Sequence, residues 1–158
     1  MTRSSLATVV AAGIFLVLAA AVLAIAPLPL AVRSAGIVLA FYLAFAVAGT
    51  PWAYVAALLA PPVGLIGGDE AWLVMLPLIL SGNLLALLAL EVGWRLSALL
   101  VSPVALLAPH VVVWALSLRE LFRLDLPWEP SALVWLALHA VASLVGVVVA
   151  VTARREPA

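Results

Sequence analysis

Long apolar runs, separated by short stretches rich in proline, glycine and charge, dominate the hydrophobic pattern of the chain. A helix that crosses a bilayer needs about 20 mostly apolar residues, and by that measure the pattern contains six such segments. They cover about residues 6–26, 34–48, 52–66, 71–92, 96–118 and 131–152. The pattern therefore predicts an all-α, polytopic membrane protein: a bundle of about six transmembrane helices that forms a single domain over residues 1–158.

The second and third segments are the shortest of the six. The third is interrupted by Pro61 and Pro62 and closed by Gly67 and Gly68. Irregular backbone at membrane depth is tolerated only where protein or a water-filled cavity covers it. These two segments are therefore expected either to span the membrane with a tilt or to enter it only partly.

Composition excludes several classes of function. Hydrophobic residues make up 68% of the chain, against about 45–50% in a soluble domain. Seven arginines balance seven acidic residues, so the chain lacks the basic surface that nucleic-acid binding needs. There is no cysteine, and hence no disulfide or thiolate metal ligand. The chain also carries no phosphate-binding loop, nucleophile elbow or metalloprotease motif, so we expect neither enzymatic activity nor a cofactor.

The arginines set the expected orientation, because cytoplasmic loops carry an excess of basic residues. With six spans, four arginines lie on one side and three on the other: Arg3, Arg95, Arg154 and Arg155 against Arg33, Arg119 and Arg123. This bias predicts a multi-pass protein of the cell's inner (plasma) membrane with both termini in the cytoplasm.

The longest loop, residues 119–130, mixes charged residues with apolar ones such as Leu126 and Trp128. Such a mixture predicts a segment that lies at the membrane interface or folds over the mouth of the bundle. The fifth segment ends at Leu118 and the sixth begins at Ser131. Both ends mark one membrane surface, from which the depth of polar residues can be counted.

Three polar residues on successive segments fall at similar depths. His110 and His139 each lie eight positions from that surface, or about 12 Å at the helical rise. Asn83, counted from the loop around Gly68, lies about 18 Å deep. His110 and Trp114 are four residues apart, as are Trp135 and His139, so each pair occupies one stripe of its helix.

This band has two interpretations. In the first, a pocket open to the outside binds a small aromatic or heterocyclic substrate through polar groups and indoles. Its predicted lining residues are Asn83, His110, Trp114, Trp135 and His139. In the second, the same polar groups bond to backbone or to each other and only hold the helices together. A metal site is disfavoured, since two histidines without a further carboxylate or thiolate form an incomplete ligand set.

Small and charged residues elsewhere suggest contacts between helices. Ala20 and Ala24 in the first segment form a small-xxx-small pair, which either packs within the chain or docks a partner membrane protein. Asp69-Glu70 is expected to form a solvated turn that starts the fourth helix. Glu91 and Arg95, four residues apart, are expected to form an ion pair at the interface.

The segment from Met75 to Leu85, with Pro77 and the pair Gly82-Asn83, continues through residues 91–95 into a fifth helix. It resembles the fourth helix of S components, the substrate-binding membrane subunits of energy-coupling factor (ECF) transporters. The resemblance implies a six-helix subunit that captures a vitamin-like micronutrient with helices four to six and the outer loops. It also implies three kinds of partner: membrane lipid, the small-molecule substrate, and a transmembrane T component with two ATPase subunits.

An alternative comes from a different class of protein. MreD-like rod-shape proteins are similar in length and helix number, and Arg33 before an apolar helix is faintly similar to them. They act as membrane scaffolds and carry no substrate. An accessory subunit of a larger membrane complex is a third possibility. A transport subunit predicts that Asn83, His110 and His139 line one outward cavity, whereas a scaffold predicts a filled core.

Overall fold

The computed structural model describes residues 3–93, 98–118 and 126–153, and within these ranges the chain is an all-α bundle without strands. The helix bounds are α1 Arg3–Ile25, α2 Leu30–Val47, α3 Thr50–Val63, the 3-10 helix η1 Gly64–Gly67, α4 Glu70–Gly93, α5 Ala98–Leu118 and α6 Ala132–Ala153. All six α-helices, with η1 extending α3, are long and apolar enough to cross a membrane. The chain is therefore a multi-pass membrane protein.

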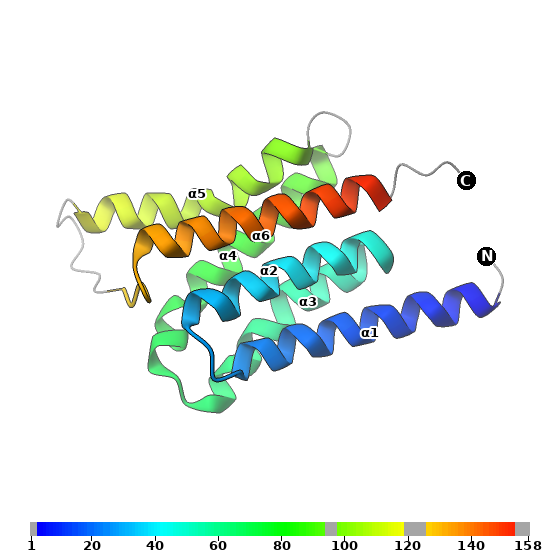
Figure 1. Cartoon of the computed structure of the whole chain (residues 1–158), viewed down its shortest axis with the longest axis horizontal. Coiled ribbons are helices and arrows are strands. Elements are labelled where there is room, and N and C mark those ends of the chain that lie inside the picture. Colours follow the sequence, from blue (N-terminus) through cyan, green and yellow to red (C-terminus); the bar gives the residue numbers. More distant parts are fainter. Residues whose placement is uncertain (1–2, 94–97, 119–125, 154–158) are drawn as a thin grey trace.

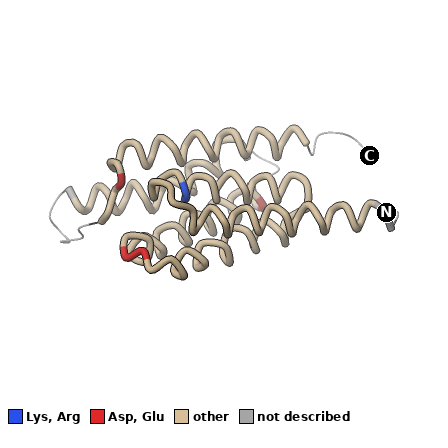
Figure 2. The backbone as a smooth tube through the Cα atoms, turned by 60° about the horizontal axis from the view of Figure 1, so that its bottom comes forward, with Lys and Arg blue, Asp and Glu red and all other residues tan. Residues whose placement is uncertain are grey.

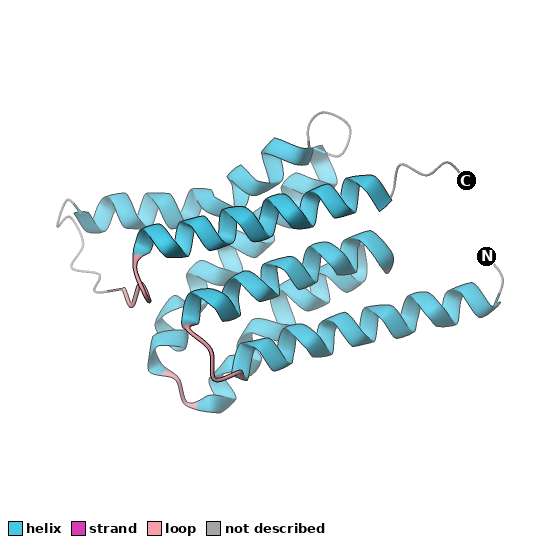
Figure 3. Ribbon diagram, in the orientation of Figure 1, coloured by secondary structure: helices cyan, strands magenta, loops and turns pink. Residues whose placement is uncertain are grey.

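The helices run side by side along the long axis, and α1 begins at the end where α6 finishes (Figure 1). We call this the terminal end. The opposite end, the loop end, holds the α1–α2 and α3–α4 connections and the start of α6, and the described loops there are short (Figure 3). Charged residues of the described part lie near helix ends, and the helix middles carry none (Figure 2). This distribution suits a bilayer, in which buried charge is costly.

Proline and glycine set the bounds of α2. Pro29 is the N-cap and stays extended, with a φ of −52° and a ψ of 141°, and α2 begins directly after it at Leu30, one turn before the predicted Ser34. After α2, Gly49 adopts a φ of 96°, which glycine tolerates best, and the chain turns into α3, whose first turn contains Pro51. α2 reaches spanning length, and so does α3 together with η1. This agrees with the first of the two expectations for these segments, that they span the membrane.

α2 is the most buried of the six helices and α1 the least. α2 packs against α6, α1 and α3, and glycines on α2 and α6 allow close approach. A Cβ atom on Gly146 of α6 would lie 2.6 Å from the Cβ of Tyr42, and one on Gly36 of α2 would lie 3.0 Å from Leu23 of α1. These close approaches hold α2 at the centre of the bundle, where its polar side chains reach several helices.

The outward faces of the bundle are apolar. Phe15 on α1, Leu100 and Val104 on α5, and Val141 on α6 are each at least 60% exposed. Surface of this kind is unfavourable in water and favourable against lipid chains. Most polar residues in the middle of the spans are instead buried: Ser34, Asn83, Ser102, His110, His139 and Ser143.

Candidate functional site

The structure brings the two histidines together. The rings of His110 on α5 and His139 on α6 lie 5.3 Å apart between centroids, and both side chains are almost fully buried. Trp135, one turn before His139, stacks on its ring at 4.6 Å, and Trp128 from the preceding loop meets Trp135 edge-on at 5.8 Å. We call His110, Trp135, His139 and Ser34 of α2 the histidine layer.

Hydrogen bonds assign the tautomers of both histidines. His110 Nδ1 lies 2.9 Å from the carbonyl oxygen of Leu106, and His139 Nδ1 lies 2.8 Å from that of Trp135. A carbonyl oxygen only accepts, so each Nδ1 carries the proton of the neutral ring and each Nε2 is an acceptor. The hydroxyl of Ser34, 2.8 Å away, donates to Nε2 of His139. His139 is thereby fully satisfied and ties α6 to α2.

Two polar atoms of the same layer have no partner. His110 Nε2, an acceptor, and Trp135 Nε1, a donor, are buried without a hydrogen bond. The two rings lie 6.1 Å apart between centroids. A buried polar atom that lacks a partner typically costs about 1–3 kcal/mol. The histidine layer therefore holds one free acceptor beside one free donor.

Gly82 of α4 makes room for His110. A Cβ atom at this position would lie 2.7 Å from His110 Cε1 and 3.0 Å from the carbonyl oxygen of Leu106. The carbonyl oxygen belongs to the backbone and cannot move aside cheaply, so any larger residue would push α5 away from α4. The glycine of the Gly82-Asn83 pair thus positions a histidine of the next helix.

A second group of polar side chains lies deeper in the bundle, on the same helices. The Ser102 hydroxyl of α5 donates to the Ala86 carbonyl of α4 at 2.8 Å. Its proton is thus committed, so the Tyr42 hydroxyl donates to Ser102 at 2.5 Å and Ser143 of α6 donates to Tyr42 at 2.8 Å. We call Tyr42, Ser102 and Ser143 the tyrosine layer; it joins four helices, and every hydroxyl in it has a partner.

Asn83 does not join the histidines. It is buried, but its Nδ2 donates to the carbonyl oxygen of Ala57 on α3, 3.0 Å away. The prediction that Asn83 and the two histidines face one cavity is therefore not what the structure shows. Consecutive residues of a helix point in directions about 100° apart, so Gly82 faces α5 while Asn83 faces α3.

Trp114 also lies outside the histidine layer. It is half-buried one turn after His110 on α5, and its carbonyl accepts a hydrogen bond from Ser117 at 2.7 Å. Of the five residues predicted to bind substrate, the structure thus groups His110, Trp135 and His139, and leaves Asn83 and Trp114 apart.

Ala20 and Ala24 are fully buried within the chain itself. α1 packs there against α2 and α3, and the guanidinium of Arg33 donates to the Ala24 carbonyl at 3.3 Å. In this structure the two alanines are covered by the chain's own helices. Of the two expectations, the pair fits packing within the chain.

Arg33 organises the loop end near the start of α4. It forms an ion pair with Asp69 and lies over the Trp72 ring, 4.5 Å from its centroid. Asp69 also accepts from the backbone N–H of Trp72 at 3.1 Å, which caps α4. Burial alone raises the pKa of the Asp69 carboxyl, but the Trp72 N–H and the Arg33 guanidinium outweigh it and hold the pKa below its ordinary value. The predicted acidic turn is thus a tether between α2 and α4.

The predicted ion pair between Glu91 and Arg95 cannot be followed, because Arg95 lies outside the described residues. Glu91 itself accepts a hydrogen bond from the Tyr54 hydroxyl of α3 at 3.0 Å. At this end of α4 the carboxylate therefore joins α4 to α3.

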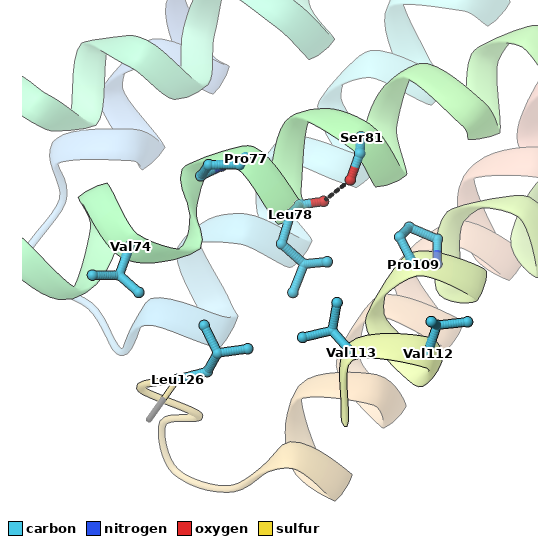
Figure 4. A pocket seen from close by; sticks show the side chains of 8 residues that line it. All are labelled: Val74, Pro77, Leu78, Ser81, Pro109, Val112, Val113 and Leu126. Atoms are coloured by element: carbon cyan, nitrogen blue, oxygen red, sulfur yellow. Dashed lines mark hydrogen bonds between the residues drawn. The ribbon is translucent and has the colours of Figure 1, made fainter. Parts of the chain in front are cut away.

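A cavity of about 400 Å³ opens between α4 and α5 near the loop end (Figure 4). Its lining residues come from both helices and the loop before α6: Val74, Pro77, Leu78, Ser81, Pro109, Val112, Val113 and Leu126. Leu126 lies between Val74 and Val113 in this view, where it borders the space between the helices (Figure 4). The walls are apolar apart from the Ser81 hydroxyl, which donates to the Leu78 carbonyl at 2.9 Å.

The cavity and the histidine layer involve neighbouring residues of α4 and α5. Ser81 and Pro109 line the cavity, and their chain neighbours Gly82 and His110 lie against each other. None of the five predicted substrate-binding residues lines this cavity, although four of its lining residues lie on the predicted helix α4. A smaller cavity of about 260 Å³ lies beside Asp69 at the loop end.

The described residues contain no group of three or more histidine, cysteine or acidic side chains that could hold a metal ion. Comparison with known proteins adds no assignment: no family model, no curated protein and no solved structure matches the chain. What the site can do rests on its own chemistry, which combines apolar walls, stacked rings and two free hydrogen-bonding atoms.

Ser34 and Tyr42 were not among the predicted site residues. The two are eight positions apart on α2, so they share one helical stripe in an otherwise apolar segment. A polar stripe on a spanning helix signals partners on neighbouring helices, and this spacing could have identified both residues. It could not have identified their partners, which come from α5 and α6.

Proposed function

We propose that the chain is the substrate-binding membrane subunit of a micronutrient uptake transporter of the ECF type. The cavity between α4 and α5 carries this proposal. Its volume of about 400 Å³ falls in the range of about 300–1,000 Å³ that is typical of small-molecule sites. The resemblance of residues 75–95 to S components implies binding by helices four to six and the outer loops, and the cavity is built from α4, α5 and the connection to α6.

The lining defines the part of the substrate that it would hold. Seven of the eight lining residues are apolar, and the hydroxyl of the eighth, Ser81, already donates to its own helix. Such a surface favours an apolar or aromatic moiety and disfavours a charged one. In this proposal the loop end faces the outside of the plasma membrane, both termini face the cytoplasm, and substrate enters beside Leu126.

The proposal also includes partners that would drive release. A T component and two ATPases would dock on the outside of the bundle. Because Ala20 and Ala24 are buried, docking would use the exposed face of α1, where residues such as Phe15 and Leu18 point outward. α1 is the least buried helix, so it has the most surface to offer.

Mass spectrometry of small molecules that co-purify with the detergent-solubilised protein tests the proposal. The wild-type chain is expected to carry a small molecule that Val113→Trp loses, because the larger side chain fills the cavity. Val111→Trp is the matched control: Val111 lies on the same helix, is exposed and does not line the cavity. Equal amounts of bound molecule in both variants would overturn the proposed site.

A membrane scaffold of the rod-shape type is the second candidate. The structure favours it in one respect: Asn83, His110 and His139 do not line the cavity, as expected of a scaffold rather than of a transport subunit, and the buried polar groups of Asn83, His139 and Tyr42 join helices of the chain. A scaffold needs such a rigid core and no substrate. In that case the wild-type protein would release no specific small molecule, and Val113→Trp would change nothing but stability.

A further inference from the structure

The two free atoms of the histidine layer differ in kind. Nε2 of His110 is an acceptor, because Nδ1 of the same ring donates to the Leu106 carbonyl. Nε1 of Trp135 can only donate. Both side chains are at least 99% buried, and their rings lie 6.1 Å apart. A single molecule that satisfies both atoms has to present a donor to His110 and an acceptor to Trp135.

The surroundings restrict the charge of such a molecule. The rings packed against the layer are neutral: His139, whose Nε2 accepts from Ser34, and Trp128. A cation would face the N–H of Trp135, and an anion would face the lone pair of His110. Either ion would also lose its hydration without a countercharge. The layer therefore suits a neutral partner.

We propose that His110 Nε2 and Trp135 Nε1 together bind a neutral group with adjacent donor and acceptor, such as a cis-lactam or a primary amide. The proposal deepens the proposed capture function, on which it rests, by naming the polar part of the substrate. The apolar part of the same molecule occupies the cavity between α4 and α5. Gly82 and His110 lie against each other and directly follow lining residues of the cavity, which places the two parts next to each other.

The polar part of this site is closed in the present structure. Neither free atom has water-accessible surface, and Trp128 packs against Trp135 from the loop before α6. Leu126 of the same loop lines the cavity. Movement of the segment from Leu126 to Trp128 away from the bundle exposes the Trp135 ring and widens the cavity together, and the substrate takes the place of the Trp128 ring edge.

Three matched probes test the proposal: 2-pyridone, which has an adjacent N–H and C=O; N-methyl-2-pyridone, which keeps only the acceptor; and toluene, which has neither. Binding is measured by equilibrium dialysis against protein in lipid nanodiscs, with empty nanodiscs as the blank. Wild-type protein is expected to bind 2-pyridone about tenfold more tightly than its N-methyl analogue, since the analogue leaves His110 Nε2 without a donor.

Trp135→Phe keeps an aromatic ring but removes the indole N–H, and it is expected to weaken 2-pyridone binding about tenfold. His110→Phe is expected to abolish the preference for 2-pyridone over the N-methyl compound. Trp52→Phe, on α3, is the matched control and is expected to bind as wild type. Thermal unfolding of each variant in detergent confirms that it is folded before binding is compared.

The outcomes separate this inference from the proposed function. Equal binding of all three probes, reduced by Val113→Trp, would overturn the donor–acceptor site and leave capture in the cavity supported. No binding of any probe above the blank would overturn the donor–acceptor site, while the co-purification experiment decides on capture independently. A preference for 2-pyridone that survives both Trp135→Phe and His110→Phe would also overturn it.

Discussion

The histidine layer and the tyrosine layer are built on the same helices but differ in their hydrogen bonding. Ser34 and Tyr42 lie eight residues apart on one stripe of α2, and His139 and Ser143 lie four residues apart on one stripe of α6. In the tyrosine layer each hydroxyl donates to the next, and the series ends on the Ala86 carbonyl. In the histidine layer, two buried atoms remain without partners.

The difference separates buried polar groups that join helices from those that we propose to be available for binding. A hydrogen bond that is fully made inside a membrane protein joins helices, and nothing more is needed to explain it. A buried donor and a buried acceptor without partners carry an unrelieved cost. Such atoms are the more informative sign of a binding site, and they occur next to the cavity at the loop end rather than deeper in the bundle.

The largest expected effect concerns the close packing under the tyrosine layer. Gly146→Ala places a Cβ atom 2.6 Å from the Cβ of Tyr42, which cannot rotate away, so α6 has to shift from α2. We expect a loss of about 2 kcal/mol in the free energy of unfolding, measured by denaturation in mixed detergent micelles. Gly67→Ala, where no atom lies within 4 Å of the new Cβ, is the control. Equal losses in both variants would show that α2 and α6 are not packed this tightly.

The next effect compares the two layers directly. Tyr42→Phe removes both hydrogen bonds of the tyrosine hydroxyl and is expected to cost about 1 kcal/mol of unfolding free energy. Trp135→Phe is expected to cost nothing or to stabilise the protein. Removal of the unpaired N–H stabilises the folded protein by about 1–3 kcal/mol. This gain offsets the cost of the small void that the indole leaves, which is about 1 kcal/mol.

Both variants are compared by the same unfolding assay, in the absence of added ligand. If Trp135→Phe loses as much stability as Tyr42→Phe, then the indole N–H has a partner and both layers are closed. That result would remove the physical basis for a polar binding site in the histidine layer.

The smallest effect concerns the ion pair at the loop end, which water reaches more easily than either layer. The folded-state pKa of Asp69 is lowered, so its contribution to stability is present above the unfolded value of about 3.9 and disappears as the pH falls through the folded pKa. Asp69→Asn is expected to cost up to about 1 kcal/mol near neutral pH, and progressively less as the pH falls through the folded pKa.

Thermal unfolding in detergent across this pH range measures the effect. Glu70→Gln, which removes the adjacent carboxylate and keeps the pair of Arg33 with Asp69, is the control. A stability difference between wild type and Asp69→Asn that stays constant down to low pH would contradict the role of the ion pair.

The sequence anticipated the helices better than the contacts between them. The bounds of α4, α5 and α6 lie within two residues of those predicted from apolar length and from the prolines and glycines that flank each run. His110 and His139 were also predicted to lie at equal depths, and in the structure their ring centroids are 5.3 Å apart. Depth follows from counting residues along a straight helix, so it needs no knowledge of neighbours.

The failures share a cause. Asn83 lies at a similar depth to the histidines yet bonds to α3, and Ala20 and Ala24 face the chain's own α2 and α3. A stripe on a helix gives a direction relative to that helix only. Which neighbour lies in that direction depends on the rotation of each helix within the bundle, and no local pattern in the sequence encodes it.

By itself, the sequence determined that this protein is a six-helix membrane bundle and that its polar residues are rare and turned inward. Those properties follow from the cost of placing polar groups in lipid, which acts on each segment separately. Only the tertiary structure decided that Ser34 completes His139, that Gly82 admits His110, and that two atoms beside the cavity stay unpaired. Hydrogen bonding and close packing act over a few ångströms between helices distant in sequence, so they are fixed only when the helices meet.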